Sequence, residues 1–392
     1  MVRAEQFSQN AWGRLIRVGL GKEGYWAYVP NPLPPPIEYD ATLITTLSQA
    51  DRALGELAGL GRTLTNPYLL VRPLVAREAV LSSRIEGTQA DLFDLYVYES
   101  AQLALPGLPI ADDTREVYQY IQAMDYALNR ISALPMSLRL IQETHEVLMQ
   151  GTRGGYAAPG QFRKTQNWIG APGCTLDEAR FVPPPPDEMR QCLYQLENYL
   201  HQDNSHPPLV RLGLIHYQFE AIHPFIDGNG RMGRLLIILL MVHWGLLPSP
   251  ILYLSEYFER HRQDYYDLLQ GVSEQGRWRD WLIFFLQGIR EQSAKSSATI
   301  RALQELYNDW RVRVEIARLR SRVIARALEL LMARPVLTVR ALQQAADCSH
   351  VAANKALMEL TRLGIVSVQG ISRRRLFVAQ EMLRLLQSPS RM

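Results

Sequence analysis

The stretch "IHPFIDGNGRMGR" occupies residues 222–234 and leads directly into the apolar run "LLIILLMVHW" at residues 235–244. Glycine and asparagine in the first part favour a tight turn, and the second part is apolar enough for a buried helix. Gly228 and Gly230 allow backbone angles that a residue with a Cβ atom avoids, and they let the chain approach a ligand closely. We therefore predict a turn that opens into the N-terminus of a buried helix over 231–244.

The charged residues of this stretch predict a site for phosphate groups. A helix N-terminus carries partial positive charge and unpaired N–H groups, and Arg231 and Arg234 both reach from its first turn. Asp227 would repel a phosphate unless a cation lay between them, which predicts Mg²⁺. His223 precedes a proline at the mouth of this site and is a candidate base, with an ordinary pKa near ~6.5. Each residue alone also has a structural interpretation, as a turn or as a packed side chain.

The composition is that of an ordinary globular protein. The chain has 392 residues, of which 47% are hydrophobic and 21% charged, enough for two or three domains. Its longest apolar run, 235–242, is too short to cross a bilayer, and no secretory signal is visible, so we expect no membrane association. Three widely spaced cysteines favour a reducing compartment, and the expected localisation is cytoplasmic.

Apolar residues recur at helical spacing through most of the chain, so the expected fold class is mainly α. The opening segment is expected to be irregular, residues 30–39 form a proline-rich extended arm, and the glycine-rich segment 151–173 predicts a hairpin or flap. The predicted helices cover 40–62, 77–95, 113–130, 137–149, 187–202, 208–221, 231–244, 259–272 and 278–320.

The C-terminal segment 301–392 is basic, with 16 Lys and Arg against 7 Asp and Glu. Three helical stretches followed by a two-strand turn centred on Gln369 and Gly370 predict a winged helix-turn-helix domain. Such a domain serves DNA contact, dimerisation or protein docking, and these alternatives stay open here. The groups available to DNA on its third helix, the recognition helix, and on its wing are His350, Asn354, Lys355, Arg362, Arg373, Arg374 and Arg375.

The run "HPFIDGNGRMGR" matches in full the signature HPFx[D/E]GNGRxxR of the Fic family, which this sequence resembles. The resemblance implies a helical Fic core with a small β-hairpin flap, and transfer of AMP from ATP to a hydroxyl side chain of a protein. It implies that His223 is the catalytic base and Asp227 the Mg²⁺ ligand. By the same resemblance, the phosphates of ATP are bound by Gly228, Asn229, Gly230, Arg231 and Arg234.

The hexapeptide "SSRIEG" at 82–87 resembles the inhibitory motif [S/T]xxxE[G/N] of the same family, with Ser82, Glu86 and Gly87 in the matching places. The resemblance implies that Glu86 pairs with Arg234 and excludes the γ-phosphate. A carboxylate and a phosphate would then compete for one guanidinium group. The structural alternative is a solvated glutamate near the end of a helix.

Two further elements resemble parts of the family site. "GQFRKTQNWIG" resembles the flap on which a target segment pairs as an added strand, with its edge at Asn167, Trp168, Ile169 and Gly170. "DYYDLL" at 264–269 offers Tyr265 or Tyr266 as a wall for adenine. The alternatives are an ordinary surface hairpin and two core tyrosines.

We expect three segments in chain order: an N-terminal arm with the inhibitory helix at 1–110, the Fic core at 111–300, and a linker helix with the winged helix at 301–392. The first functional hypothesis is a self-inhibited protein adenylyltransferase that also modifies itself and removes AMP. The second is a nucleotide-sensing, DNA-binding regulator. Transfer of UMP or phosphocholine stays open. By the resemblance, the phosphorylating relatives have a lysine at the position of Gly230, so the glycine favours transfer of AMP. The expected partners are ATP, Mg²⁺, a hydroxyl-bearing protein, a second copy of the chain and DNA.

Overall fold

The computed structural model describes residues 4–19, 24–64, 67–104, 111–131, 133–152, 158–171, 173–202, 206–370 and 375–387. Its described part is mainly helical, as the sequence predicts. The chain divides into two compact units, which comprise Met1–Gly55, Gln122–Leu246 and Leu254–Gln292, and Glu56–Ile121, Leu247–Tyr253 and Ser293–Met392. The segment boundary expected at 110/111 falls inside the stretch Glu56–Ile121 of the second unit, and the one expected at 300/301 falls inside its stretch Ser293–Met392.

The first unit opens with a β-hairpin, in a segment that was expected to be irregular. Strands β1 (Gly13–Val18) and β2 (Tyr25–Pro30) pair antiparallel, from Gly13 opposite Pro30 to Val18 opposite Tyr25. Aromatic and β-branched residues make up half of these strands, which suits a half-buried pleated surface. The hairpin packs on the segment that follows the flap, where the Tyr28 N–H donates to the Val182 carbonyl over 2.9 Å.

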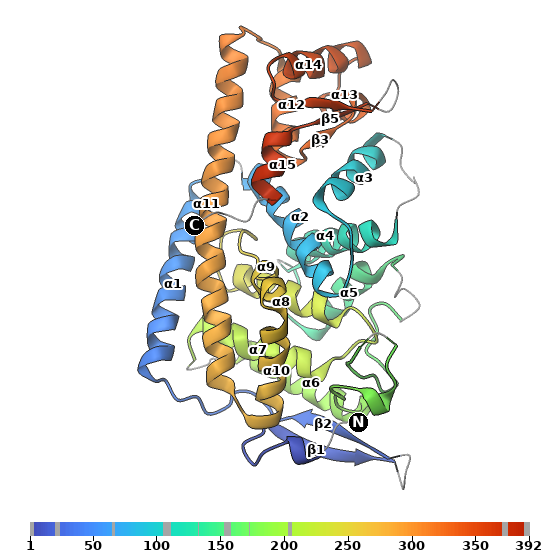
Figure 1. Ribbon diagram of the computed structural model, residues 1–392, viewed down its shortest axis with the longest axis vertical. Coiled ribbons are helices and arrows are strands. Elements are labelled where there is room, and N and C mark those ends of the chain that lie inside the picture. Colours follow the sequence, from blue (N-terminus) through green and yellow to red (C-terminus); the bar gives the residue numbers. More distant parts are fainter. Residues whose placement is uncertain are drawn as a thin grey trace. The chain divides into compact units, whose positions relative to one another are not determined.

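The core of the first unit forms around α7 and α8, which pack on each other (Figure 1). Most side chains of both helices are buried, and the buried ones lie on all sides of each helix, as expected for helices at the centre of a core. α6 also packs on α7, and α5 packs on α8. The helices of this unit include α5 (Leu138–Met149), α6 (Pro186–His201), α7 (Pro208–Ile222), α8 (Asn229–His243), α9 (Ser255–Arg260) and α10 (Arg262–Gln275). Three helices run from one unit into the other: α1 (Ala41–Arg62), α4 (Asp112–Arg130) and α11 (Trp278–Ile316).

Two of the predicted elements differ in the first unit. The helix predicted over 259–272 is two helices, because His261 leaves helical geometry between α9 and α10. Within the described residues the flap is not a regular hairpin, since its pairing there is one isolated bridge between Ile169 and Phe181. Two short 3-10 helices, η1 (Ala4–Gln6) and η3 (Leu176–Glu178), complete this part.

In the second unit, the helix predicted over 77–95 is also wrong, because α2 (Pro67–Ile85) and α3 (Leu92–Ala104) are separate helices. Gly87, with φ of +101°, turns the chain after α2. The carboxylate of Asp91 then accepts the Asp94 N–H over 2.9 Å at the start of α3.

The C-terminal helices of the second unit pack on α2 and α3 (Figure 1). α12 and α15 contact α2, while α13 and β3 contact α3. The short strands form one antiparallel sheet in the order β3-β5-β4, and β4 ends at Gln369, where the turn was predicted. The elements are α12 (Arg322–Ala333), β3 (Val336–Leu337), α13 (Val339–Ala346), α14 (His350–Arg362), β4 (Ser367–Gln369), β5 (Leu376–Val378) and α15 (Gln380–Gln387).

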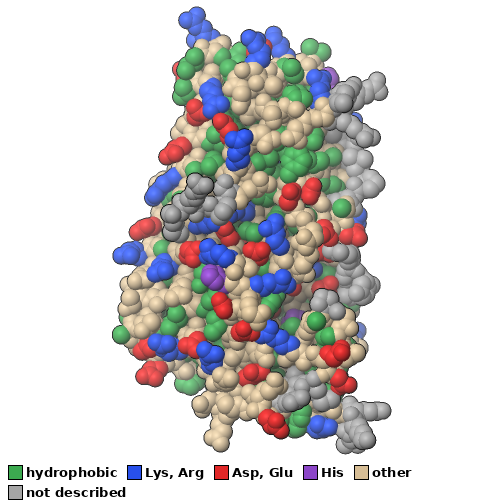
Figure 2. All heavy atoms as spheres, in the orientation of Figure 1, with side chains coloured by type: hydrophobic (Ala, Val, Ile, Leu, Met, Phe, Trp, Pro, Cys, Tyr) green, Lys and Arg blue, Asp and Glu red, His purple; other side chains and the backbone are tan. Residues whose placement is uncertain are grey.

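No helix in the described ranges combines the length and the apolarity needed to cross a membrane. Figure 2 shows basic and acidic side chains interspersed over the drawn face, with no broad field of a single sign.

Candidate active site

The signature sequence connects the end of α7 to the start of α8. His223 caps α7 in the left-handed conformation, with φ of 49° and ψ of 62°, and its N–H still donates to the Phe219 carbonyl. Pro224 follows, and a residue before proline is disfavoured in the helical conformation, so α7 ends here. Gly228, also left-handed, is the N-cap of α8. The predicted turn and buried helix are therefore both present, and α8 begins two residues earlier than predicted, at Asn229.

The side chain of Asn229 shapes this loop from within. Its Oδ1 accepts the Phe225 N–H and its Nδ2 donates to the Phe225 carbonyl, each over 2.8 Å. Only 2% of the residue is exposed. Both side-chain groups are thus engaged by the loop, so any contact of Asn229 with a phosphate comes from its main-chain N–H at the start of α8.

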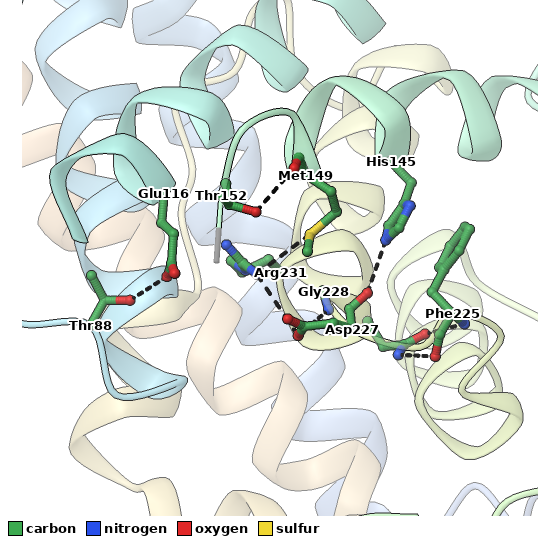
Figure 3. A network of polar contacts seen from close by, with 10 residues as sticks. Thr88, Glu116, His145, Met149, Thr152, Phe225, Asp227, Gly228 and Arg231 are labelled. Carbon is green, nitrogen blue, oxygen red and sulfur yellow. Dashed lines mark hydrogen bonds and ion pairs between the residues drawn. The ribbon is translucent and has the colours of Figure 1, made fainter. Parts of the chain in front are cut away.

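Two buried arginines make the first two turns of α8 electropositive. Arg231 is 4% exposed and Arg234 2% exposed. Arg231 Nη2 donates to Met149 Sδ over 3.6 Å and lies 4.0 Å from Asp227 Oδ1 (Figure 3). Because the positive end of the helix dipole disfavours cations, two guanidinium groups buried there favour an anionic ligand.

The carboxylate of Asp227 lies at the rim of this turn. Its side chain is 52% exposed, and Oδ1 accepts the Gly228 N–H over 2.6 Å. No group of three or more His, Cys, Asp or Glu side chains converges as a metal site within the described ranges. Mg²⁺ is commonly held by one or two carboxylates with substrate phosphates supplying further oxygens, so a single exposed carboxylate beside a phosphate site fits this ion.

The imidazole of His223 is half-buried, and its Nδ1 lies 3.3 Å from the Glu220 carbonyl oxygen. A carbonyl accepts only, so Nδ1 donates in this contact and the basic lone pair of the neutral ring is on Nε2. The same loop therefore holds both the candidate base and the electropositive turn, only a few residues apart.

A second histidine supports the loop, and no sequence pattern had singled it out. The ring of His145, on α5, stacks on Phe225 with centroids 3.6 Å apart and planes at 3°. Its Nδ1 accepts the Gly160 N–H over 3.0 Å, so Nε2 carries the proton and donates to the Asp227 carbonyl over 2.9 Å (Figure 3). Burial lowers the pKa of His145 to about 4, which keeps this tautomer neutral.

The flap residues predicted for target docking lie beside this loop. Asn167 Nδ2 donates to the Phe225 carbonyl over 2.8 Å, so its side chain holds the loop. The main chain of Ile169 pairs with Arg180 and Phe181. If the segment is extended on both sides of this bridge, main-chain groups alternate in direction, and those of Trp168 and Gly170 are the ones available to an added strand. Trp168 is 40% exposed, and its Nε1 donates to the Cys174 carbonyl.

The two tyrosines of α10 have different surroundings. Tyr265 is 1% exposed, and its hydroxyl bonds His216 Nε2 over 2.7 Å inside a cluster of aromatic rings. Its ring therefore presents no face to a nucleotide in this structure. Tyr266 is half-buried, with the Arg262 guanidinium 5.9 Å from its ring centroid, and we keep it as the candidate adenine contact.

The inhibitory motif lies at the C-terminus of α2, in the second unit. Ser82 is fully buried, whereas Glu86 and Gly87 are exposed just beyond the helix end. The next residue, Thr88, donates its hydroxyl to Glu116 over 2.8 Å (Figure 3). This bond ties the segment after the motif to α4. The pairing of Glu86 with Arg234 stays a prediction.

Comparison with known proteins agrees with this geometry. Residues 44–129 match the family described as Fic/DOC family N-terminal, and residues 135–241 match the Fic/DOC family domain itself. Over residues 135–241 the chain is thus similar to a Fic domain. That domain includes the flap, His223 and the first turn of α8, while the N-terminal domain includes the motif with Glu86.

Insect proteins named Protein adenylyltransferase Fic are similar to part of this chain. The chain is 31% identical over 196 residues to Protein adenylyltransferase Fic of Drosophila grimshawi, which is 48% of this chain and 36% of that protein. It is 29% identical over 199 residues to the protein of the same name from Culex quinquefasciatus, covering 48% and 35%. The aligned part thus spans about a third of the length of these relatives.

A solved structure shares the fold. The crystal structure of a Fic family protein from Desulfovibrio desulfuricans G20 superposes with a TM-score of 0.54 and 21% identity. The match covers 88% of this chain and 98% of that one. At this identity, the likeness concerns the fold alone.

Proposed function

We propose that this chain is a protein adenylyltransferase. It transfers AMP from ATP to a Ser, Thr or Tyr hydroxyl of a target protein and of itself. The observation that carries the proposal is the single loop that joins a histidine, oriented by the Glu220 carbonyl, to a helix N-terminus with two buried arginines. The adenylyltransferase names of the relatives support the same assignment.

In this proposal the phosphates of ATP bind at the N-terminus of α8. Main-chain N–H groups of Gly228, Asn229 and Gly230 and the guanidinium of Arg231 receive the α- and β-phosphates, and Arg234 receives the γ-phosphate. Asp227 would hold Mg²⁺, which supplies neutralisation of the phosphate charge when it is bound.

The chemistry then requires one proton acceptor and accurate positioning. Nε2 of His223 takes the proton of the target hydroxyl as its oxygen attacks the α-phosphorus. The bond from that phosphorus to the β-phosphate oxygen breaks, and pyrophosphate leaves. Removal of this base is expected to slow transfer by about 10²- to 10⁴-fold.

The target segment is proposed to pair with the flap edge formed by the main chains of Trp168 and Gly170. Main-chain pairing orients the target hydroxyl without reading much of its sequence. The main-chain groups of Ile169 already bond Arg180 and Phe181, so Ile169 donates and accepts no hydrogen bond to the target in this proposal.

The proposed brake is Glu86, held by the end of α2 and pairing with Arg234. We propose that AMP transfer is weak while the brake is engaged, and that removal of AMP from modified protein occurs in this state. Ser82, buried in α2, and Gly87, with positive φ beyond its end, fix the position of the glutamate.

Incubation with labelled ATP and Mg²⁺ tests the activity. We expect weak self-labelling in the natural chain, strong labelling in Glu86→Gly, and none in the double variant Glu86→Gly with His223→Ala. Equal labelling in the single and double variants would remove the enzyme proposal. Equal labelling with and without Glu86 would remove the brake alone.

The regulator hypothesis has less support, since a nucleotide sensor needs no base beside its phosphate site. We also propose that residues 301–392 form a winged-helix domain. This domain would contact DNA or a second copy of the chain. Arg373 and Arg374 of the predicted wing lie outside the described residues, while Arg375 Nη2 donates to Asn354 over 3.5 Å. A salt-dependent DNA shift that vanishes in Lys355→Ala with Arg362→Ala would favour the regulator.

A further inference from the structure

Arg163, at the base of the flap, is a charged residue that the proposed chemistry does not use. Only 2% of it is exposed. Within the described residues, no carboxylate forms an ion pair with it. A buried cation is costly unless it is well hydrogen-bonded, so this arginine needs a specific role.

Main-chain carbonyl groups surround its guanidinium. Nε donates to the His223 carbonyl over 2.9 Å, and Nη2 donates to the Ile222 carbonyl over 3.4 Å and to that of Pro184. Nη1 donates to the Thr165 carbonyl over 3.2 Å. The Arg163 N–H adds a fifth bond, to the Pro224 carbonyl over 2.9 Å.

Two of these acceptors are the last carbonyls of α7. Carbonyls at a helix C-terminus have no intrahelical partner and carry the negative end of the helix dipole, so a cation is favoured there. Arg163 therefore caps α7 from a segment about 60 residues away in sequence. Its pKa is lowered to about 10, with burial as the main cause, which still leaves it charged at neutral pH.

The cap acts on the residue that matters most to the chemistry. His223 is a non-glycine residue in the left-handed conformation, which is disfavoured unless the surroundings hold it. Its carbonyl receives Arg163 Nε at 2.9 Å and lies 3.5 Å from Asn167 Nδ2. Fixing this carbonyl fixes the backbone from which the imidazole projects.

We infer that Arg163 is a positioning residue that fixes the backbone of His223 and joins the flap to the catalytic loop as one rigid piece. The target hydroxyl, docked on the flap, and the base that deprotonates it are thereby held in one frame. This inference rests on the proposed function. The phosphate site on α8 does not depend on the cap, since no hydrogen bond described for Arg163 involves residues 227–234.

The test compares Arg163→Lys, Arg163→Gln and Arg163→Met with the matched control Lys164→Met, an exposed neighbour on the flap. All are made in the full-length Glu86→Gly chain, so that the proposed brake does not mask activity. We expect kcat for AMP transfer to fall about 10²-fold in Arg163→Met, because a small misplacement of a reacting group costs about that much. Arg163→Lys keeps the positive charge but not the planar set of guanidinium donors, so its loss of kcat should be smaller than that of Arg163→Met.

Nucleotide affinity separates positioning from general damage. The Kd of a non-hydrolysable ATP analogue should change less than twofold in all four variants. A parallel loss of nucleotide affinity and kcat in Arg163→Met would overturn the inference, because Arg163 would then support the fold as a whole. A kcat of Arg163→Met within twofold of that of Lys164→Met would overturn it too.

A spectroscopic readout tests the inference even if AMP transfer is absent. In protein labelled at the histidine rings, the His223 resonance, assigned with His223→Ala, should move in Arg163→Lys and stay in place in Lys164→Met. The His216 resonance, buried elsewhere on α7, serves as an internal reference. A His223 resonance that does not move in Arg163→Lys overturns the positioning role. Absence of AMP transfer in every variant overturns the proposed function instead.

Discussion

The ring of His145 donates a hydrogen bond from Nε2 to the main-chain carbonyl of Asp227, over 2.9 Å, while stacking on Phe225. Its other nitrogen accepts the Gly160 N–H. One neutral imidazole on α5 thus fixes the carbonyl of the proposed metal ligand and the flap at Gly160.

Substitution of His145 tests this support. Leucine would leave the Asp227 carbonyl and the Gly160 N–H without their partner, so we expect a loss of stability of about 2–4 kcal/mol. AMP transfer by the Glu86→Gly chain should fall at least about tenfold, because the loop loses its rigid support. Glutamine can keep the donor to Asp227, and it should recover part of both losses. Equal stability and activity in the leucine and natural proteins would contradict this role.

The proposed catalytic loop, residues 223–234, could be predicted from the sequence because the residues that form it are close together along the chain. The spacing of Gly228, Arg231 and Arg234 along one turn and one helix predicts a phosphate site, and this spacing can be read from the sequence. His145 and Arg163 act on residues 82 and 60 positions away, and no local pattern marks such contacts. The same limit applies to Tyr265, since spacing places it on α10 but tertiary packing decides that it is buried.

The β1–β2 hairpin and the break between α2 and α3 were missed for a related reason. β1 and β2 are short and lie among turn-forming residues, so neither gives a periodic signal of its own. The α2 and α3 patterns run together in sequence, and only the positive φ of Gly87 and the bond at Asp91 separate them.

Gly228 should resist substitution for two separable reasons. Its φ is +79°, and a Cβ atom there would lie 2.6 Å from Met149 Sδ and 3.2 Å from His145 Nε2. Moving the Met149 sulfur would also disturb the contact with Arg231. We expect Gly228→Ala to destabilise the protein by about 2–4 kcal/mol and to weaken binding of an ATP analogue.

Gly245 provides the matched control for this variant. It also has positive φ, of +69°, but a Cβ atom added there would meet no atom within 4 Å beyond its chain neighbours. Gly245→Ala should therefore show only the backbone cost, about 1–2 kcal/mol, with unchanged nucleotide binding. Denaturant unfolding and calorimetry measure both quantities, and identical results for the two variants would remove the packing argument.

His216 should make the protein sensitive to acid. Burial, with the charge of Arg234 as a second cause, lowers the pKa of His216 to about 3. In the unfolded chain this imidazole takes up a proton near pH ~6.5, so the unfolded state binds more protons as the pH falls below that value. From about pH 6.5 to about pH 4.5, this group alone should remove about 2–3 kcal/mol of stability.

The double variant His216→Phe with Tyr265→Phe isolates this effect. It removes the titrating ring together with the hydroxyl that bonds it, so no buried polar group is left unpaired at this contact. Urea unfolding at the two pH values should show a smaller acid loss in the variant, by about that amount. The same pH dependence in both proteins would contradict the assignment.

Glu99, on α3, links the inhibitory helix to the C-terminal helices, because it pairs with both Arg72 and Arg334. Arg72, on α2, bonds Glu99 Oε1 on α3, and Arg334, just after α12, lies 3.4 Å from Oε2. Arg72 and Glu99 are 6% and 3% exposed. Removal of one partner of a buried pair leaves an uncompensated charge, so Glu99→Gln should cost about 3–5 kcal/mol.

The paired variant Arg72→Leu with Glu99→Leu should cost less than Glu99→Gln, because it leaves only the more exposed Arg334 without its partner. Either change weakens the contacts that hold α2 in place, and the last residue of α2, Ile85, directly precedes Glu86. If Glu86 acts as the brake, self-labelling should rise in both variants at temperatures where circular dichroism shows them folded. Labelling that stays at the natural level in folded Glu99→Gln would mean that the C-terminal helices do not set the position of the brake.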